Sequence, residues 1–143
     1  MIIFDTNVIS EALRPVPDPA VMAWLRSVSR LEIWTCTIAL AELFSGVDLM
    51  PSGRRQQLLR EKMEQLVPAL FVNQVLAFDL PAVRAYGPIL VARRALGHPI
   101  DETDAFIAAI AKVHGATLAT RNTSDFEDCG IQLVNPWQSI HPS

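Results

Sequence analysis

The sequence predicts a single α/β domain in which helices cover a parallel sheet. Short apolar runs alternate with helical patterns along the chain, and no repeat, linker or low-complexity segment interrupts them. The first run, Ile2–Phe4, has three consecutive large apolar residues, which is typical of a strand buried on both faces. With 143 residues, half of them hydrophobic, the chain can form one complete core. We therefore expect one domain over residues 1–143.

The composition excludes several kinds of site. Cys36 and Cys129 match no zinc or CxxC spacing, and the three histidines are scattered. No apolar run reaches membrane-spanning length, and Asp5 follows the first residue too closely for a signal peptide. We therefore expect a reduced, cytoplasmic protein without membrane association. The net charge of -3 argues against broad electrostatic binding of nucleic acid, unless cations neutralise converging carboxylates.

The first half of the chain is predicted to alternate strands and helices. After Ile2–Phe4, a short helix is expected over residues 8–13. Asp18 before Pro19 predicts the start of the next helix, in which Trp24 belongs to an apolar stripe facing the core. A second strand is then expected over residues 31–35. The helix that begins at Thr37 contains Glu42 among mostly small neighbours.

The second half continues this alternation. A third strand is expected over residues 75–78, and Pro81 begins a helix that Pro88 should kink or break. Asp101 is a suitable N-cap for a helix rich in small apolar residues. Residues 116–120 predict another buried strand, and polar residues again follow its carboxyl end.

Acidic and amide side chains occur where a functional site is expected. Ligands of open α/β sheets bind beyond the carboxyl ends of the strands, which is where Asp5 lies. Each acid also has a purely structural interpretation: Asp5 as a helix cap, Glu42 as an exposed helix residue, and Asp104 as a favourable charge near a helix N-terminus. The oxygen-bearing candidates are Asp5, Glu42, Asp104, Asn122 and Asp125.

Taken together, these candidates favour a site for a hard cation. Carboxylate oxygens suit Mg²⁺ or Mn²⁺, and no His or Cys cluster competes for a softer metal. Two such ions, about 3.5 to 4 Å apart, can stabilise both the attacking water and the leaving oxygen of a phosphodiester. Hydrolytic cleavage of phosphodiesters is therefore the predicted chemistry.

Four segments, in this order, resemble the successive motifs of PIN-domain ribonucleases. They are IFDTN at 3–7, AE at 41–42, DAFIAA at 104–109 and TRNTSDF at 120–126. Segments VISE at 8–11, RP at 14–15 and NPW at 135–137 are similar to VapC toxins of bacterial toxin–antitoxin pairs, especially the FitB-like branch. The resemblance covers almost the whole chain.

This resemblance implies an α/β/α sandwich with a central, mainly parallel sheet. It implies an endoribonuclease, dependent on Mg²⁺ or Mn²⁺, that acts on structured or single-stranded RNA as the toxin of a pair. It also implies a homodimer, a cognate antitoxin, and operator DNA bound by the complex through the antitoxin. The alternative is a catalytically weak or inactive PIN-like module that binds RNA or an antitoxin.

Roles for individual residues also follow from the resemblance. Asp5 and Asp104 are expected to be the principal metal ligands, and Glu42 to complete the acidic cluster directly or through water. Hydrogen bonding by Thr6 would order the site. The residues expected to position substrate are Thr6, Thr120, Arg121 and Asn122.

The chain departs from the family pattern at the fourth acid. In relatives an acid follows the Thr at the end of the later strand, whereas this chain has Asn122, with Asp125 three residues further on. We expect Asp125 to supply the fourth catalytic acid. A haloacid dehalogenase-like phosphatase is disfavoured, because its second Asp would stand where this chain has Asn7.

Two further expectations concern surfaces. The tail segment 135–137 is interpreted as packing. The candidates for a dimer face are the surplus apolar residues of one helix: Leu40, Leu43, Phe44 and Val47.

Overall fold

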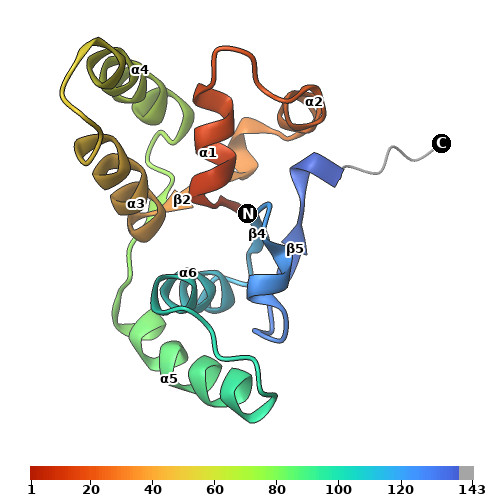
Figure 1. Ribbon diagram of the computed structural model, residues 1–143. Coiled ribbons are helices and arrows are strands. Elements are labelled where there is room, and N and C mark those ends of the chain that lie inside the picture. The colour runs from red at the N-terminus through yellow and green to blue at the C-terminus, as the bar shows by residue number, and fades with distance from the viewer. Residues whose placement is uncertain (139–143) are drawn as a thin grey trace.

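A five-stranded parallel sheet forms the middle layer of the fold (Figure 1). The structure is a computed structural model and describes residues 1–138. The strand order is β3-β2-β1-β4-β5, so the first strand of the chain lies at the centre. The strands are β1 (Ile2–Phe4), β2 (Ile33–Cys36), β3 (Val75–Leu76), β4 (Thr117–Ala119) and β5 (Gln132–Val134).

Helices cover both faces of the sheet, which confirms the predicted α/β/α sandwich (Figure 1). One layer contains α1 (Thr6–Leu13), α2 (Pro19–Ser27), α3 (Thr37–Asp48) and α4 (Arg54–Leu70). The other contains α5 (Leu80–Ala95) and α6 (Glu102–Val113). Short 3₁₀ helices are η1 (Arg30–Glu32), η2 (Thr123–Phe126) and η3 (Pro136–Gln138). None of the helices within residues 1–138 is long and apolar enough to cross a membrane.

The central strand contributes to two separate cores. Ile3 is fully buried in the cluster under α5 and α6, whereas its neighbour Phe4 is buried in the cluster under α1, α3 and α4. Successive side chains of a strand point to opposite faces, which explains this division. A strand covered on both sides needs apolar residues at every position, as predicted from the run Ile2–Phe4.

Aspartate side chains cap the starts of four α-helices: α1, α2, α5 and α6. Asp5 accepts a hydrogen bond from the Thr6 N–H at 2.8 Å, so α1 begins two residues earlier than predicted. Asp18 and Asp101 cap α2 and α6 as expected from the sequence. The second strand begins later than predicted, because residues 30–32 form η1 before it.

Helix α5 is continuous from Leu80 to Ala95, so the chain does not break at Pro88 as the sequence predicted. Proline normally disfavours helical backbone in the preceding residue, partly by contact with its Cβ atom. Here the preceding residue is Gly87, which has no Cβ, and Pro88 is exposed. The helix therefore loses one backbone hydrogen bond at Pro88, but the proline ring meets no Cβ atom of the preceding residue.

The apolar residues of α3 pack mainly into the core. Leu43 and Val47 are 5% and 4% exposed, and Leu40 and Phe44 pack partly buried against the same cluster. Leu43 and Val47 are therefore core residues of the single chain, and a dimer face on α3 stays a prediction. Trp24, predicted as a core residue, packs with its ring centroid 5.4 Å from that of Phe4.

Candidate functional site

The parallel register brings the ends of β1 and β4 side by side. Phe4 pairs with Ala119, and the Asp5 N–H donates to the Ala119 carbonyl oxygen at 3.0 Å. The next residues, Asp5 and Thr120, are therefore neighbours although 115 positions separate them. This is the edge of the sheet at which the sequence predicts a site.

Asp5 is held at this edge by two hydrogen bonds. The Thr6 N–H donates to Oδ1 and the Thr120 hydroxyl donates to Oδ2, both at 2.8 Å. The residue is 6% exposed, and burial raises the pKa of its carboxyl group despite these two donors. Asp5 is thus both a helix cap and a buried carboxylate aimed at the cleft, so its structural and functional interpretations do not exclude each other.

Glu42 joins the site from α3 through Thr6. The Thr6 hydroxyl oxygen lies 3.0 Å from Glu42 Oε1 and 3.2 Å from the Ala39 carbonyl oxygen, so its one proton serves either acceptor. The second Glu42 oxygen is left for other partners. Partial burial, more than any neighbouring charge, raises the pKa of Glu42.

Thr120 connects the remaining polar groups. Its hydroxyl oxygen accepts hydrogen bonds from Asn7 Nδ2 at 3.3 Å and from the Asn122 N–H at 3.2 Å, while it donates to Asp5. The Arg121 N–H donates to Asn7 Oδ1 at 3.2 Å. The loop after β4 is therefore attached to the start of α1, and the oxygens of Asp5 have a defined orientation.

Asp104 approaches the same cleft from the first turn of α6. It is half-buried and shares the cleft lining with Asp5 and Glu42. Desolvation raises the pKa of Asp104 to about 7, and the charges of neighbouring carboxylates, with Asp5 first among them, add to this effect. The cleft has a volume of about 470 Å³, and its other lining residues are Thr6, Asn7, Ser10, Glu11, Arg14, Arg121, Asn122 and Trp137.

The cleft fits a hydrated hard cation better than one ligated fully by protein. Among residues 1–138, no three His, Cys, Asp or Glu side chains form a ready-made metal-binding group. However, Asp5, Glu42 and Asp104 all have raised pKa values. The charge of Asp5 contributes to the shifts of Glu42 and Asp104, and the charge of Glu42 contributes to the shift of Asp104. A cation would relieve this repulsion, and Mg²⁺ commonly keeps several waters while it binds one or two carboxylates.

The structure separates the two candidates for the fourth acid. Asn122 lines the cleft, whereas Asp125 is exposed in η2 and does not. The charge of Asp125 nevertheless contributes to the raised pKa values of Asp5 and Asp104. Asp125 therefore acts on the acids from a distance, and Asn122 occupies the lining position.

Three cleft residues, two on α1 and one directly after it, were not identified from the sequence. Ser10 and Glu11 follow Asn7 at helical spacing and extend the face of α1 that begins beside Asp5, and Arg14 is the C-cap of the same helix. This helical spacing from Asn7 was the feature of the sequence that could have identified them. Glu11 is 4% exposed and accepts hydrogen bonds from the Arg14 guanidinium and the Asp18 N–H, both at 3.3 Å, which holds the following loop in place.

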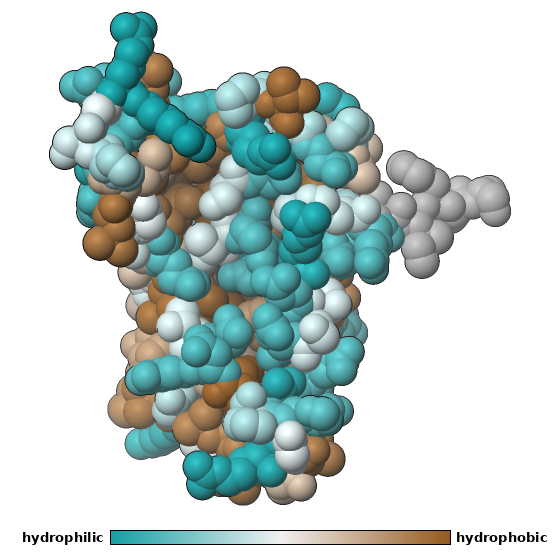
Figure 2. Space-filling view, in the orientation of Figure 1, coloured by the Kyte–Doolittle hydropathy of each residue, from teal (hydrophilic) through white to brown (hydrophobic). Residues whose placement is uncertain are grey.

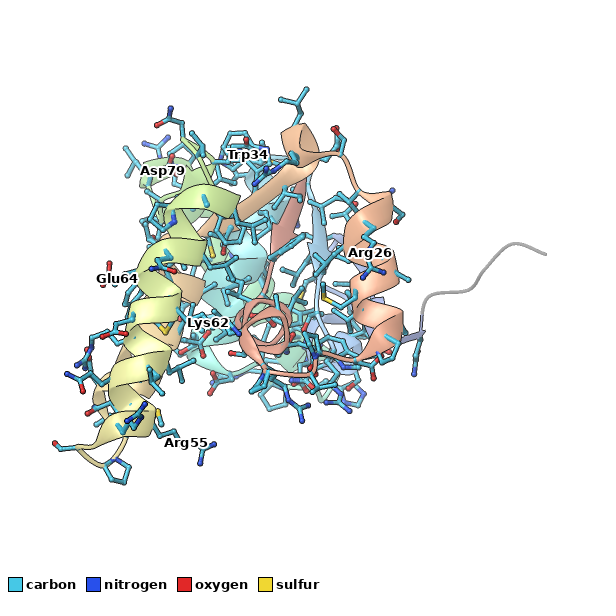
Figure 3. The ribbon with its side chains drawn as sticks, turned by 90° about the horizontal axis from the view of Figure 1, so that it is seen from above. Arg26, Trp34, Arg55, Lys62, Glu64 and Asp79 are labelled. Atoms are coloured by element: carbon cyan, nitrogen blue, oxygen red, sulfur yellow. The ribbon has the colours of Figure 1, made fainter. Side chains whose placement is uncertain are left out.

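An apolar groove adjoins the cleft. It lies between α1, α3 and α4, has a volume of about 590 Å³, and shares Thr6, Ser10, Arg14 and Glu42 with the cleft. Figure 2 shows apolar surface in the recess between these helices. Lys62 reaches from α4 toward α1 and donates to the Leu13 carbonyl oxygen at 2.7 Å (Figure 3). The groove is thus an open continuation of the acidic site.

Comparisons with known proteins agree with this architecture. The chain matches the PIN domain family over residues 2–130. It is 44% identical over 139 residues to the plasmid stability protein StbB of Pseudomonas syringae pv. tomato, covering 97% of this chain and 100% of that protein. It is 41% identical over 137 residues to the toxin FitB of Neisseria gonorrhoeae, and 40% over 139 residues to the VapC ribonuclease Y4jK of Sinorhizobium fredii. Each alignment covers 96% of this chain and 99% of the relative.

Solved structures show the same likeness. The TM-score is 0.91 with FitAB bound to an IR36 DNA fragment, at 40% identity and 99% coverage of both chains. It is 0.90 with FitAcB from Neisseria gonorrhoeae, at 40% identity, with 97% of this chain and all of that chain covered. The sheet and its acidic edge are those of a PIN-domain protein. The chain belongs to the PIN-domain family, in the branch that contains the VapC and FitB proteins, which confirms the resemblance found in the sequence.

Proposed function

We propose that this protein is a metal-dependent endoribonuclease that hydrolyses RNA phosphodiester bonds and acts as the toxin of a toxin–antitoxin pair. The observation that carries the proposal is the convergence of buried Asp5 with Glu42 and Asp104 on one cleft. Carboxylates with raised pKa values at the end of a central strand are typical of a functional site. Relatives named as a VapC ribonuclease and as a toxin support the assignment.

Mg²⁺ or Mn²⁺, once bound, would activate water and stabilise the charge that develops on the phosphodiester. Asp5 and Asp104, which both line the cleft, would hold the cation. The Thr6 N–H and the Thr120 hydroxyl fix the two oxygens of Asp5, so this ligand needs little reorganisation. Glu42, whose carboxylate accepts from the Thr6 hydroxyl, would orient the attacking water.

The second candidate is a weak or inactive module that binds RNA or an antitoxin. It is favoured by the amide of Asn122 at a cleft position where relatives have an acid, and by the lack of three closely grouped acids within residues 1–138. An amide oxygen binds a cation without neutralising its charge. Turnover in the presence of metal distinguishes the two candidates.

The apolar groove supports an antitoxin as the partner. Solved relatives of this chain include FitAB and VapBC complexes, several of them bound to DNA. An antitoxin segment that fills the groove would bury its apolar lining and reach Glu42 and Arg14, which belong to groove and cleft alike. A homodimer, a cytoplasmic location and operator DNA bound through the antitoxin belong to the same proposal.

The test is cleavage of a mixed transfer and messenger RNA pool by antitoxin-free protein with Mg²⁺, Mn²⁺ or EDTA. We expect cleavage only with metal, by the wild type and not by folded Asp5→Asn, leaving 5′-phosphate and 3′-hydroxyl ends. Ends with a 2′,3′-cyclic phosphate would contradict attack by water. Binding of RNA or antitoxin without any cleavage would instead support the inactive module.

A further inference from the structure

One wall of the acidic cleft carries a tryptophan that the proposed hydrolysis does not use. Trp137 lies in η3 and lines the cleft together with Asp5 and Asp104. Part of the residue packs against the core cluster that also contains Phe4, yet the residue is only half-buried. The interpretation of this tail as packing is therefore incomplete, because part of Trp137 belongs to the cleft surface.

Arg121 lies over this tryptophan. Its guanidinium carbon is 5.1 Å from the centroid of the Trp137 ring, within the range of a cation–π contact. Arg121 is exposed, lines the same cleft, and forms no salt bridge with any residue of the described part of the chain. Its positive charge is thus available to a ligand at the edge of an acidic site.

A chain of hydrogen bonds attaches this pair to the carboxylate end of the cleft. Asn7, two residues after Asp5, accepts from the Arg121 N–H at 3.2 Å. Asn135 Nδ2 then donates to the Arg121 carbonyl oxygen at 3.3 Å, and Asn135 Oδ1 accepts from the Trp137 N–H at 2.9 Å. Consecutive contacts of this kind hold the ring at a defined place beside Asp5, as a preorganised binding surface requires.

We propose that Arg121 and Trp137 form a nucleobase subsite of the cleft. An unpaired RNA base next to the scissile phosphate stacks on the Arg121–Trp137 pair, and the guanidinium contacts the phosphate of that nucleotide. The inference rests on the proposed ribonuclease function and deepens it, since the subsite requires a single-stranded segment or loop at the cut. Stacking on aromatic and guanidinium planes is the usual way to bind unpaired bases. It also supplies affinity that a chain of net charge -3 does not obtain from electrostatics alone.

Fluorescence tests the stacking directly, because Trp137 can be made the only tryptophan. The chain has three, and the variant with Trp24→Phe and Trp34→Phe retains Trp137 alone. The probes are a short single-stranded oligoadenylate and an abasic ribose-phosphate strand of equal length, with Ca²⁺ bound and the RNA checked for integrity. We expect the oligoadenylate to quench Trp137 and the abasic strand to leave it unchanged. Equal quenching by both strands would overturn the subsite.

Binding by single-site variants of the otherwise native chain provides a second, independent measurement. Trp137→Ala should weaken oligoadenylate binding by about 5- to 150-fold, the range expected for loss of one base–aromatic stack, and leave binding of the abasic strand unchanged. Trp24→Phe is the matched control, because Trp24 packs on the same cluster but does not line the cleft. Wild-type affinity of Trp137→Ala for oligoadenylate would refute the proposal.

The charge of Arg121 has its own control. Arg121→Ala should weaken binding of both strands more than Arg54→Ala does, because Arg54 is exposed on α4 and lines neither the cleft nor the groove. These assays measure binding without cleavage, so the two proposals fail separately. If RNA is cleaved but Trp137→Ala binds oligoadenylate with wild-type affinity, only the subsite proposal fails. If oligoadenylate quenches Trp137 but no metal-dependent cleavage occurs, only the nuclease proposal fails.

Discussion

The acidic cleft and the apolar groove adjoin each other along α1, yet the side chains that line them differ in chemistry. The cleft lies at the carboxyl ends of β1 and β4, where backbone hydrogen bonding brings Asp5 and Thr120 together. The groove lies between α1, α3 and α4 and is lined largely by aliphatic side chains such as Leu43 and Met63. Buried charge makes the cleft unfavourable without a cation, whereas the apolar groove favours a partner that covers it.

The shared residues show how closely the two regions are linked. Glu42 faces both, because its helix α3 forms one side of the groove while its carboxylate reaches Thr6 at the cleft. A partner in the groove can therefore affect the acids without displacing them. A substitution at a residue that lines only one of the two regions should nevertheless leave the function of the other region unchanged. Such substitutions test whether the cleft and the groove act separately.

The largest expected effect comes from the cleft. Asp5→Asn should lower the rate of RNA cleavage by about 10³-fold or more, because it removes a buried ligand charge worth several kcal/mol in the transition state. Cleavage rates at saturating Mg²⁺ measure this effect.

The same variant should keep its fold and its affinity for antitoxin. Burial raises the pKa of Asp5, so the ionised carboxylate opposes folding near neutral pH. The neutral amide removes this cost but loses one of the two hydrogen-bond acceptors, so the melting temperature in EDTA should change little. Activity within tenfold of the wild type would show that Asp5 is not the main ligand.

The next effect concerns the groove alone. Gly46 of α3 lines it, and a Cβ atom there would have no neighbour within 4 Å. Gly46→Leu should therefore fit without strain, occupy space needed by the partner, and weaken antitoxin binding at least about tenfold. Cleavage of RNA by the free protein should not change.

Ala92→Leu is the control for this change, because Ala92 is also exposed on a helix but lies in α5, away from the groove. Gly46→Leu should also stabilise its helix by up to about 1 kcal/mol relative to glycine. If Ala92→Leu weakened antitoxin binding as much as Gly46→Leu, the groove would not be the docking site. Calorimetric titration with the cognate antitoxin measures both.

A pH dependence follows from Asp104. Its pKa is raised from the ordinary 3.8 to about 7, so the protonated form is favoured in the folded state without metal. Stability in EDTA should accordingly decrease as pH rises from about 4 to about 7. Cation binding requires the ionised form, so Mg²⁺ affinity should fall up to about tenfold per pH unit below 7. Thermal melts with and without Mg²⁺ measure both trends, and an unchanged slope in Asp104→Asn would contradict the assignment.

The smallest effect distinguishes Asp125 from Asn122. Asp125 is exposed and acts through charge alone, so Asp125→Asn should change the cleavage rate by only about two- to fivefold. Asn122→Asp adds a carboxylate to the cleft lining and should strengthen Mg²⁺ binding. Loss of activity in Asp125→Asn would instead support the prediction that Asp125 is the fourth catalytic acid.

The sequence alone determined the parts of this protein that depend on neighbours along the chain. The apolar run Ile2–Phe4 identified a strand covered on both faces, and Asp18 and Asp101 marked helix starts, because burial of a strand and capping of a helix are local properties. Ordered motifs identified the family and the acids Asp5, Glu42 and Asp104, which the structure brings to one cleft.

Only the tertiary structure decided which side chains share a cavity. Asn122 and Asp125 are three residues apart, but one lines the cleft and the other does not, because η2 turns the chain between them. Trp137 reaches the cleft from the end of the described chain, and the groove exists only where three helices pack together. Cavities form between elements that are distant in sequence, so their lining depends on packing and sheet register, which no local pattern specifies.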